Sequence, residues 1–417
     1  MPTTLYDTTV LRKATLRLVP FLGLLYIISF LDRVNVGYAA LTMNADIGLS
    51  ASAFGLGAGI FFIGYFLFEV PSNLILQRVG ARIWIARILV TWGVISIAMA
   101  GIRGPASFYA ARFTLGLAEA GFFPGMILYL TYWFPDAVRG RIIGWFMLAI
   151  PISNVIGAPL STLLLDHPIF GLTGWQTMFV VEGVPAVLMG LVVLAWLPDR
   201  PASAAWLTPD ERATLEQLAA RTTPAASRLI DGLASGRVWL LALVYFGLVI
   251  GLYGLGFWAP QIIRSLGTTS NTRIGLLSAV PYLVAGVCMV IWGRHSDATG
   301  ERRWHVFAPA CLGAAGFAVS AMVTTPAVSL AALTAGAIGI YAAMPVFWTL
   351  PTAMLGGTAA AGGIALVNSL GNLGGYLGPF AIGWLKDATG SYSAGLLVLA
   401  IGMASAGLLV LMLGKKA

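Results

Sequence analysis

The chain has 417 residues, of which 59% are hydrophobic and 10% are charged, with a formal net charge of +8. A soluble chain of this length has about a quarter of its residues charged, so too few ionised groups remain here to cover a water-exposed surface. The composition therefore excludes the soluble protein classes and predicts a protein embedded in lipid. Its basic residues are spread over many short loops, which suits an anionic membrane leaflet and excludes a nucleic-acid groove.

A helix needs about 20 apolar residues to cross the hydrocarbon core of a membrane. The sequence contains about twelve such runs, and we expect spans at residues 17–38, 52–77, 83–101, 106–131, 139–163, 176–197, 237–262, 273–293, 304–323, 326–350, 359–383 and 391–413. An even number of crossings places both termini on one side. Most of the Lys and Arg residues fall in loops on that side, which predicts that both termini face the cytoplasm.

The longest polar segment, residues 198–236, divides the predicted spans into two halves. Within it, residues 208–211 read Thr-Pro-Asp-Glu, which is typical of a helix N-terminus with a capping threonine and a proline in the first turn. We therefore predict an N-terminal six-helix bundle over 1–197, a connecting loop with a short amphipathic helix over 198–236, and a C-terminal six-helix bundle over 237–417.

Two loops on the side of the termini share a pattern. The pattern resembles the signature G-x-x-x-D-[RK]-x-G-[RK]-[RK] of the major facilitator superfamily. Residues 293–303 keep the first glycine and the aspartate of this signature, whereas residues 73–82 have Asn73 and Gln77 at these two positions. The resemblance implies that such loops latch the two halves. We assign gating or structural roles to Glu69, Arg78, Arg82, Asp297 and Arg302.

More specific motifs lie within the spans. They are FLDRVN at 30–35, EVPSN at 69–73, a stretch from Arg112 to EAGFFPG at 119–125, YWFP at 132–135, and NSLGNLGG at 368–375. Together they resemble the anion:cation symporter family of the major facilitator superfamily, in its bacterial branch of tartrate, phthalate and sugar-acid permeases. The resemblance implies an all-α membrane protein with two six-helix bundles around a central cavity. It also implies alternating access in a bacterial inner membrane and uptake of a small organic anion with protons.

Independently of the resemblance, the predicted spans contain ionisable side chains, and each costs roughly 2.5–3.5 kcal/mol at the centre of a lipid-facing helix. They are Asp32, Arg33, Glu69, Arg112, Glu119 and Glu182. Because the first and fourth spans run in opposite directions, Arg33 and Arg112 fall at one depth, about 9–11 Å from the outer boundary. Glu119 lies two turns beyond Arg112 on the same helix face, nearer the midplane. We expect this group to face a wet cavity.

Such a group can couple an anion to a proton. An organic carboxylate that binds an arginine makes the site negative, so proton binding by the nearest carboxylate becomes more favourable. The resemblance assigns substrate binding to Arg33 and proton coupling to Asp32, Arg112 and Glu119. The alternative is that Asp32 and Arg112 form only a structural ion pair between helices. Glu69 and Glu182 lie nearer the membrane faces beside prolines, which favours structural or gating roles.

Uncharged polar side chains within the spans could supply further hydrogen bonds to a hydroxylated acid. The candidates for substrate binding are Tyr65, Asn154, Trp348, Asn368, Ser369 and Asn372. Asn368 and Asn372 are four residues apart and therefore share a helix face.

The function predicted from these features is proton-coupled symport of a carboxylate, by a functional monomer in the lipid bilayer. The alternatives are an exchanger of organic anions or phosphates without proton coupling, and a transport-like membrane sensor. An enzyme is not expected, because the sequence has no motif for a nucleophile and base or for metal ligands. Cys288 and Cys311 lie in apolar runs without metal-binding spacing, so we expect no cofactor and no metal.

Overall fold

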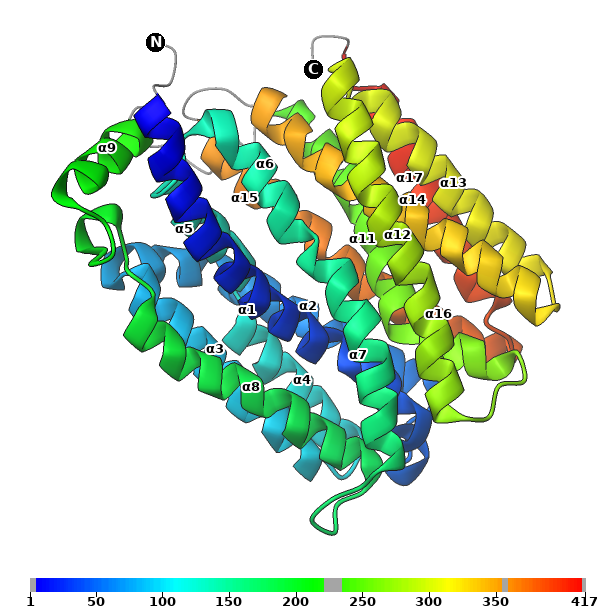
Figure 1. Ribbon diagram of the computed structural model, residues 1–417. Helices are drawn as coiled ribbons and strands as arrows, with labels where there is room; N and C mark the ends of the chain where they lie inside the picture. The colour runs from blue at the N-terminus through cyan, green and yellow to red at the C-terminus, as the bar shows by residue number, and fades with distance from the viewer. Residues whose placement is uncertain (1–4, 221–234, 355–358, 415–417) are drawn as a thin grey trace.

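The computed structural model describes residues 5–220, 235–354 and 359–414, and all regular secondary structure in these ranges is helical (Figure 1). The N-terminal helices are α1 (Leu5–Asp46), α2 (Ala51–Val79), α3 (Ala81–Ala98), α4 (Pro105–Glu119), α5 (Phe122–Thr131), α6 (Asp136–Met147), α7 (Ala149–Asp166) and α8 (Gly174–Trp196). A short helix, α9 (Pro209–Ala220), follows them. The C-terminal helices are α11 (Gly236–Ser265), α12 (Asn271–Thr299), α13 (Arg303–Met322), α14 (Pro326–Met354), α15 (Ala359–Asn372), α16 (Gly374–Thr389) and α17 (Ser393–Leu411).

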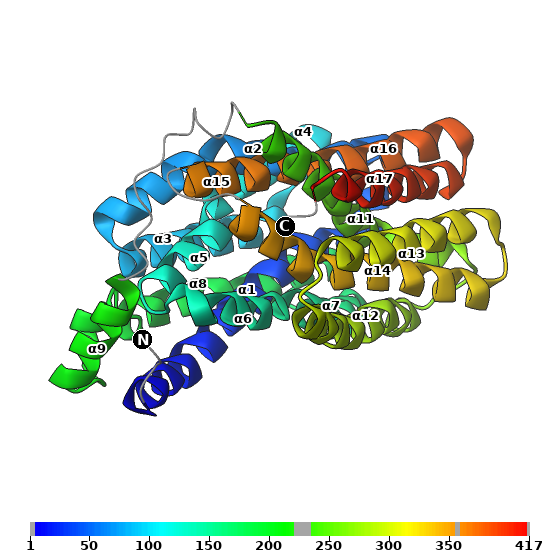
Figure 2. The ribbon, with the colours of Figure 1, turned by 90° about the horizontal axis from the view of Figure 1, so that it is seen from above.

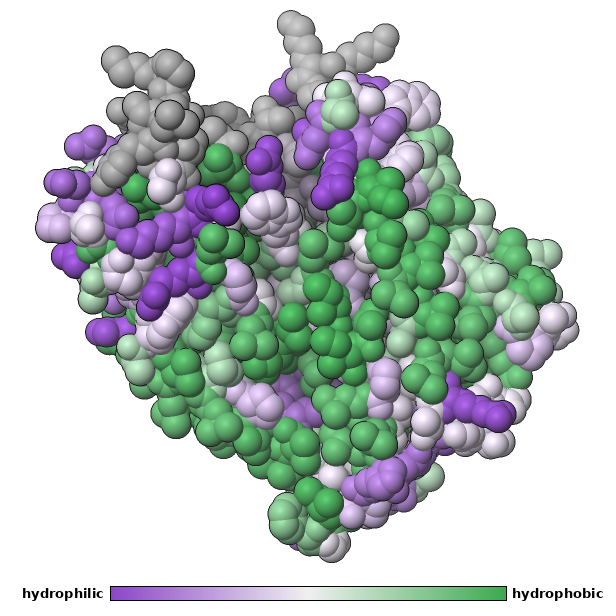
Figure 3. Space-filling model, viewed as in Figure 1, coloured by the Kyte–Doolittle hydropathy of each residue, from purple (hydrophilic) through white to green (hydrophobic). Residues whose placement is uncertain are grey.

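Within the described ranges, 11 helices are long and apolar enough to cross a membrane. Each of them overlaps one of the predicted spans. The remaining predicted span, 359–383, falls on α15 and α16. These two helices are separated at Leu373 and have 14 and 16 residues, so neither alone has the length of about 20 residues that a membrane span needs. The hydrophobic surface between the hydrophilic ends of the molecule is the face expected to contact lipid (Figure 3).

Two further predicted spans, the fourth and the fifth, are also broken. The fourth ends as α4 at Glu119 and resumes as α5 after Gly121, whose φ of 84° is in the region that favours glycine. A Cβ at Gly121 would lie 2.2 Å from Ser72 Oγ, so α2 also packs closely against this break. The fifth span is broken between α6 and α7, where Pro151 cannot donate the helical hydrogen bond to Met147.

The N-terminal and C-terminal helices form two groups that lie side by side (Figures 1 and 2). They meet where α1 packs on α11, α2 on α16, and α7 on α12. Glycines allow the backbones to approach closely: a Cβ at Gly37 would lie 2.7 Å from the Phe257 carbonyl oxygen, and one at Gly55 would lie 2.5 Å from that of Pro379.

Both termini lie at one end of the molecule, the termini end (Figure 1). At the opposite end of the molecule, hydrogen bonds join the two groups of helices. Asp387 of α16 accepts from the backbone N–H of Ser52 at 2.7 Å, at the start of α2. Asp166 of α7 accepts from Asn271 at 2.8 Å, and Arg264 of α11 donates to the Leu41 carbonyl of α1. These contacts hold the two groups together on the side away from the termini.

Candidate functional site

Arg33 lies on α1 between the two groups of helices, with 5% of its surface exposed. Its Nη1 donates to the Tyr253 hydroxyl of α11 at 2.8 Å, and its Nη2 forms an ion pair with Glu119 at the end of α4. A guanidinium can reach two partners at once because its donors form a fixed, planar fork. Arg33 therefore connects α1 to both groups of helices.

Glu119 occupies the last position of α4, immediately before the break at Gly121. It is 1% exposed and accepts hydrogen bonds from Ser29 Oγ, at 2.7 Å, and from Arg33. A buried carboxylate that loses its cationic partner is costly unless it binds a proton. The arrangement can therefore exchange one state, in which Glu119 is paired with Arg33, for another in which Glu119 is protonated and Arg33 is available to an anion.

Arg112 is fully buried on α4 and faces the same aromatic ring as Arg33. The two guanidiniums lie 4.9 Å and 5.4 Å from the centre of the Phe61 ring, so the structure brings both arginines and Glu119 together. Arg112 Nη2 donates to the Ala58 carbonyl at 3.3 Å, while its Nε and Nη1 have no hydrogen-bond partner among the described residues. It is thus a buried cation without a carboxylate on its guanidinium in this structure.

Asp32 faces a different direction from Arg33, its neighbour in the chain. Its carboxylate accepts from Trp92 Nε1 at 2.7 Å and lies 3.5 Å from Ser96 Oγ, both on α3. The structure therefore places Asp32 against the N-terminal helices, and its hydrogen bonds go to α3 and not to Arg112. An ion pair between Asp32 and Arg112 is not formed in this state.

A small cavity lies between the two groups of helices beside Arg33. Of the predicted substrate-binding residues, Tyr65, Asn368 and Asn372 line it together with Arg33. It is also lined by side chains that the sequence analysis did not select, including Tyr26, Tyr245 and Tyr253. Four phenols, two amides and one guanidinium provide donors and acceptors for a hydroxylated anion.

The remaining predicted substrate-binding residues do not line this cavity. Asn154 donates to the Ile150 carbonyl of its own helix at 3.0 Å. The Trp348 ring packs edge-on against the ring of Tyr245, with centroids 4.9 Å apart. Ser369 points to Glu69, to which it donates at 3.0 Å.

Glu69 connects the two groups of helices through hydrogen bonds from α2 to α15. It lies on α2, one turn beyond Tyr65, and is 2% exposed. Its Oε1 accepts from the Asn368 amide and its Oε2 from the Ser369 hydroxyl, both on α15. No Lys or Arg of the described chain forms an ion pair with it within 4.0 Å, so neutral donors alone hold this carboxylate.

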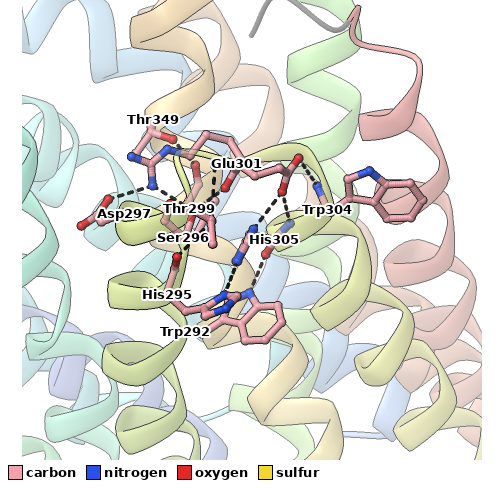
Figure 4. Close-up of polar contacts among 11 residues, drawn as sticks. Trp292, His295, Ser296, Asp297, Thr299, Glu301, Trp304, His305 and Thr349 are labelled. Atoms are coloured by element: carbon pink, nitrogen blue, oxygen red, sulfur yellow. Dashed lines mark hydrogen bonds and ion pairs between the residues drawn. The ribbon is translucent and has the colours of Figure 1, made fainter.

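The predicted gating residues of the second loop form a polar cluster at the termini end (Figure 4). Arg302 donates to Asp297 at 2.7 Å and to Ser296 at 2.8 Å. Beside them, the His295 and His305 rings share a hydrogen bond of 2.7 Å, and His305 contacts Glu301 at 2.8 Å. Partial burial acts to raise the pKa of Glu301, but hydrogen bonds from Trp304 and His305 outweigh it and hold the pKa below its usual range. Sequence analysis did not select this histidine pair.

The first of the two signature loops, residues 73–82 where α2 ends and α3 begins, is arranged differently. Arg78 is exposed, and the backbone N–H of Arg82 donates to Asp199 at 2.8 Å, so an acid from the segment after α8 caps the start of α3. Asp199 therefore supplies an acid beside Gly80 and Arg82, in a loop that has Gln77 where the signature has aspartate. Within the described ranges, no group of three or more His, Cys, Asp or Glu residues could hold a metal ion.

The fold and the site define a multi-pass helical membrane protein whose two groups of helices enclose a buried, charged cavity. The Major Facilitator Superfamily pattern matches residues 22–379, which is most of the chain. The chain belongs to this superfamily and is a membrane transporter, as the sequence resemblance predicted.

Comparisons with known proteins support the same assignment. The chain is similar to a protein named "Putative tartrate transporter" from Agrobacterium vitis, with 55% identity over 92% of this chain and 89% of that protein. It is 45% identical to the "Quinolone resistance transporter" of Acinetobacter baumannii, over 92% and 90% of the two chains. The solved structure of the xylose transporter XylE from E. coli, in a partially occluded inward open conformation, gives a TM-score of 0.75 over 95% of this chain and 97% of that chain. At 15% identity, that likeness shows the fold alone.

Proposed function

We propose that this transporter takes up a small organic anion together with protons, by alternating access. The observation that carries the proposal is the position of Arg33, which is buried beside the cavity and holds a carboxylate of the protein, Glu119, at one end of its guanidinium. An incoming carboxylate would compete with Glu119 for that guanidinium. The site thus has a cation for the anion and an acid for the proton.

Coupling follows from the burial of these groups. When substrate takes the place of Glu119 on Arg33, the Glu119 carboxylate is left buried without a cation. Protonation of Glu119 removes the free-energy cost of this unpaired charge. Substrate binding and proton binding therefore favour each other by equal free energies. A carrier with this linkage moves mainly in the fully loaded and empty states.

The names of two relatives support two candidate classes of substrate. The name of the Agrobacterium relative, at 55% identity, supports tartrate or another hydroxy-carboxylate, and sugar acids and phthalate-like acids carry the same recognisable carboxylate. Export of a quinolone is a second candidate, favoured by the 45% identical relative from Acinetobacter. We further propose that two bundles over 1–197 and 237–417, connected by the 198–236 loop, move relative to each other, that the chain is a functional monomer, and that it resides in a bacterial inner membrane. Residues 221–234 of the loop lie outside the described ranges.

Uptake by the purified protein in proteoliposomes tests the proposal. An inwardly directed proton gradient is expected to drive labelled tartrate above its equilibrium level, and a protonophore is expected to abolish this accumulation. Tartrate exchange that is indifferent to the gradient would instead identify an uncoupled exchanger. Gradient-driven movement of norfloxacin without movement of tartrate would identify a quinolone transporter.

The orientation gives a separate prediction. The loop charges place the termini end in the cytoplasm, so a cysteine at Ser203 should react with a membrane-impermeant maleimide only after the membrane is opened. A cysteine at Thr269, in the loop between α11 and α12, should react in intact cells. Both positions are exposed, and replacing Cys288 and Cys311 by alanine removes background labelling. The opposite labelling pattern would reverse the assigned orientation.

A further inference from the structure

Two buried arginines and two buried carboxylates lie at or near the cavity, and of these four groups Arg33 lines it. Glu119 is paired with Arg33, while Arg112 lies over the Phe61 ring without a carboxylate on its guanidinium. The second carboxylate, Glu69, is held by Asn368 and Ser369. With both glutamates ionised, their charges balance those of the two arginines. Asp32 and Glu182 accept hydrogen bonds from Trp92 and Ser161 within the N-terminal helices. A substrate that binds Arg33 and α15 therefore displaces neither of them, and their charges are the same in the empty and loaded carrier.

The contacts of Glu69 are those that a substrate carboxylate would need. Its two oxygens accept from two separate donors on α15, an amide and a hydroxyl, which is a two-point arrangement suited to any carboxylate. Asn368 also lines the cavity, and its amide oxygen has no hydrogen-bond partner among the described residues. The donors on α15 are therefore adjacent to the space that a substrate would occupy.

We infer that Glu69 is a second proton-coupled carboxylate, and that Asn368 and Ser369 bind the second carboxylate of a dicarboxylate substrate when Glu69 releases them. This inference rests on the proposed function and narrows its substrate class to small dicarboxylates. One substrate carboxylate replaces Glu119 on Arg33, and the other replaces Glu69 on α15. Each displaced glutamate binds one proton from the side of entry and returns it on the side of release.

Charge balance supports a stoichiometry of two protons for each dicarboxylate. Once the substrate has bound and both glutamates are protonated, the two negative charges of the substrate balance the two positive charges of the arginines, so the net charge of the centre is the same as in the empty carrier. A monocarboxylate leaves Glu69 on α15 and requires only the proton on Glu119. The number of coupled protons should therefore follow the number of substrate carboxylates.

Tartrate and threonate form a matched pair for the test, because threonate has a hydroxymethyl group where tartrate has its second carboxylate. In proteoliposomes, the proton gradient that just balances a known substrate gradient measures the number of coupled protons. We expect two for tartrate and one for threonate with the unmodified protein. Glu69→Gln should reduce the value for tartrate to one and leave that for threonate unchanged.

Glu182→Gln is the matched control. Glu182 is also a buried carboxylate, 3% exposed, and it accepts from Ser161 at 2.7 Å within the N-terminal helices. This variant should keep two protons for tartrate. Tartrate coupling that stays at two in Glu69→Gln would overturn the inference and leave the proposed function intact. If the unmodified protein moves tartrate with no response to a proton gradient, the proposed function fails as well.

A binding measurement covers the case in which Glu69→Gln does not fold. Each proton taken up on binding changes the apparent dissociation constant by about tenfold per pH unit, at pH values where the free site is deprotonated. In the unmodified protein, tartrate affinity should therefore fall about tenfold more per pH unit than threonate affinity. Equal pH dependence for the two acids would overturn the inference without recourse to any variant.

Discussion

Replacement of Arg33 by lysine is expected to weaken tartrate binding by about 10-fold to 100-fold while the protein still inserts and folds. The Arg33 guanidinium reaches Tyr253 on α11 and Glu119 on α4 from one planar group. A lysine ammonium keeps the charge, but it is a point donor and cannot present two parallel N–H groups to a carboxylate. The loss of one charged hydrogen bond costs about 1.5–3 kcal/mol, which corresponds to about that change in affinity.

Calorimetric titration of the detergent-purified variants measures this loss. Arg87→Lys is the matched control, because Arg87 is a half-buried arginine that packs on the Trp84 ring, at 3.9 Å from its centre, away from the cavity. That variant should bind tartrate like the unmodified protein. If Arg33→Lys binds tartrate normally, the substrate carboxylate is held by another group, and Arg112 is the next candidate.

The charged part of the site could be predicted from the sequence because ionisable residues are costly in lipid and therefore need a partner or a wet cavity. Helical rise also predicted a common level for Arg33 and Arg112, whose guanidiniums both lie over the Phe61 ring. Depth alone does not give the direction in which a side chain points. Asp32 and Arg33 are successive residues, about 100° apart around the helix, and the structure directs them to α3 and to the cavity respectively.

The aromatic lining could not be predicted in the same way. Tyr26, Tyr245 and Tyr253 lie in apolar runs, where a tyrosine that packs in the core has the same sequence surroundings as one whose hydroxyl faces a cavity. Only the packing of α1 against α11 brings the Tyr253 hydroxyl to Arg33. The hydrogen bonds of Glu69 were missed for a similar reason, because its partners lie on α15, about 300 residues away in the chain.

The breaks in the spans also could not be predicted from the lengths of the apolar runs. A run of apolar residues remains a good membrane segment whether or not its helix is continuous, so the fourth and fifth spans satisfy the length criterion despite their interruptions. The break after Glu119 needs the left-handed conformation of Gly121 and its close contact with Ser72. This break makes Glu119 the final residue of α4, where its side chain meets Arg33.

Replacement of Glu119 by glutamine should abolish proton-driven accumulation of a monocarboxylate such as threonate, and should remove one of the two protons coupled to tartrate, while leaving exchange of both substrates intact. Glutamine has nearly the shape of a protonated glutamate and cannot release a proton, so it fixes the site in the form that we assign to the loaded carrier. Glu119 contacts Arg33 directly, and a neutral residue there leaves the guanidinium available to the substrate at all times. Labelled substrate inside proteoliposomes should therefore still exchange with unlabelled substrate outside.

The two assays separate this role from a structural one. A variant that is merely misfolded would lose exchange together with accumulation, whereas loss of the coupling group removes accumulation alone. Asp32→Asn provides the comparison, since the Asp32 carboxylate accepts from Trp92 on α3 and lies away from Arg33, so it should keep gradient-driven uptake if Glu119 carries the proton. If Glu119→Gln still concentrates threonate with full dependence on the proton gradient, while Asp32→Asn does not, the proton is carried by Asp32. The hydrogen bond from Trp92 would then have to open during transport, and the cavity beside Arg33 would serve only to bind the anion.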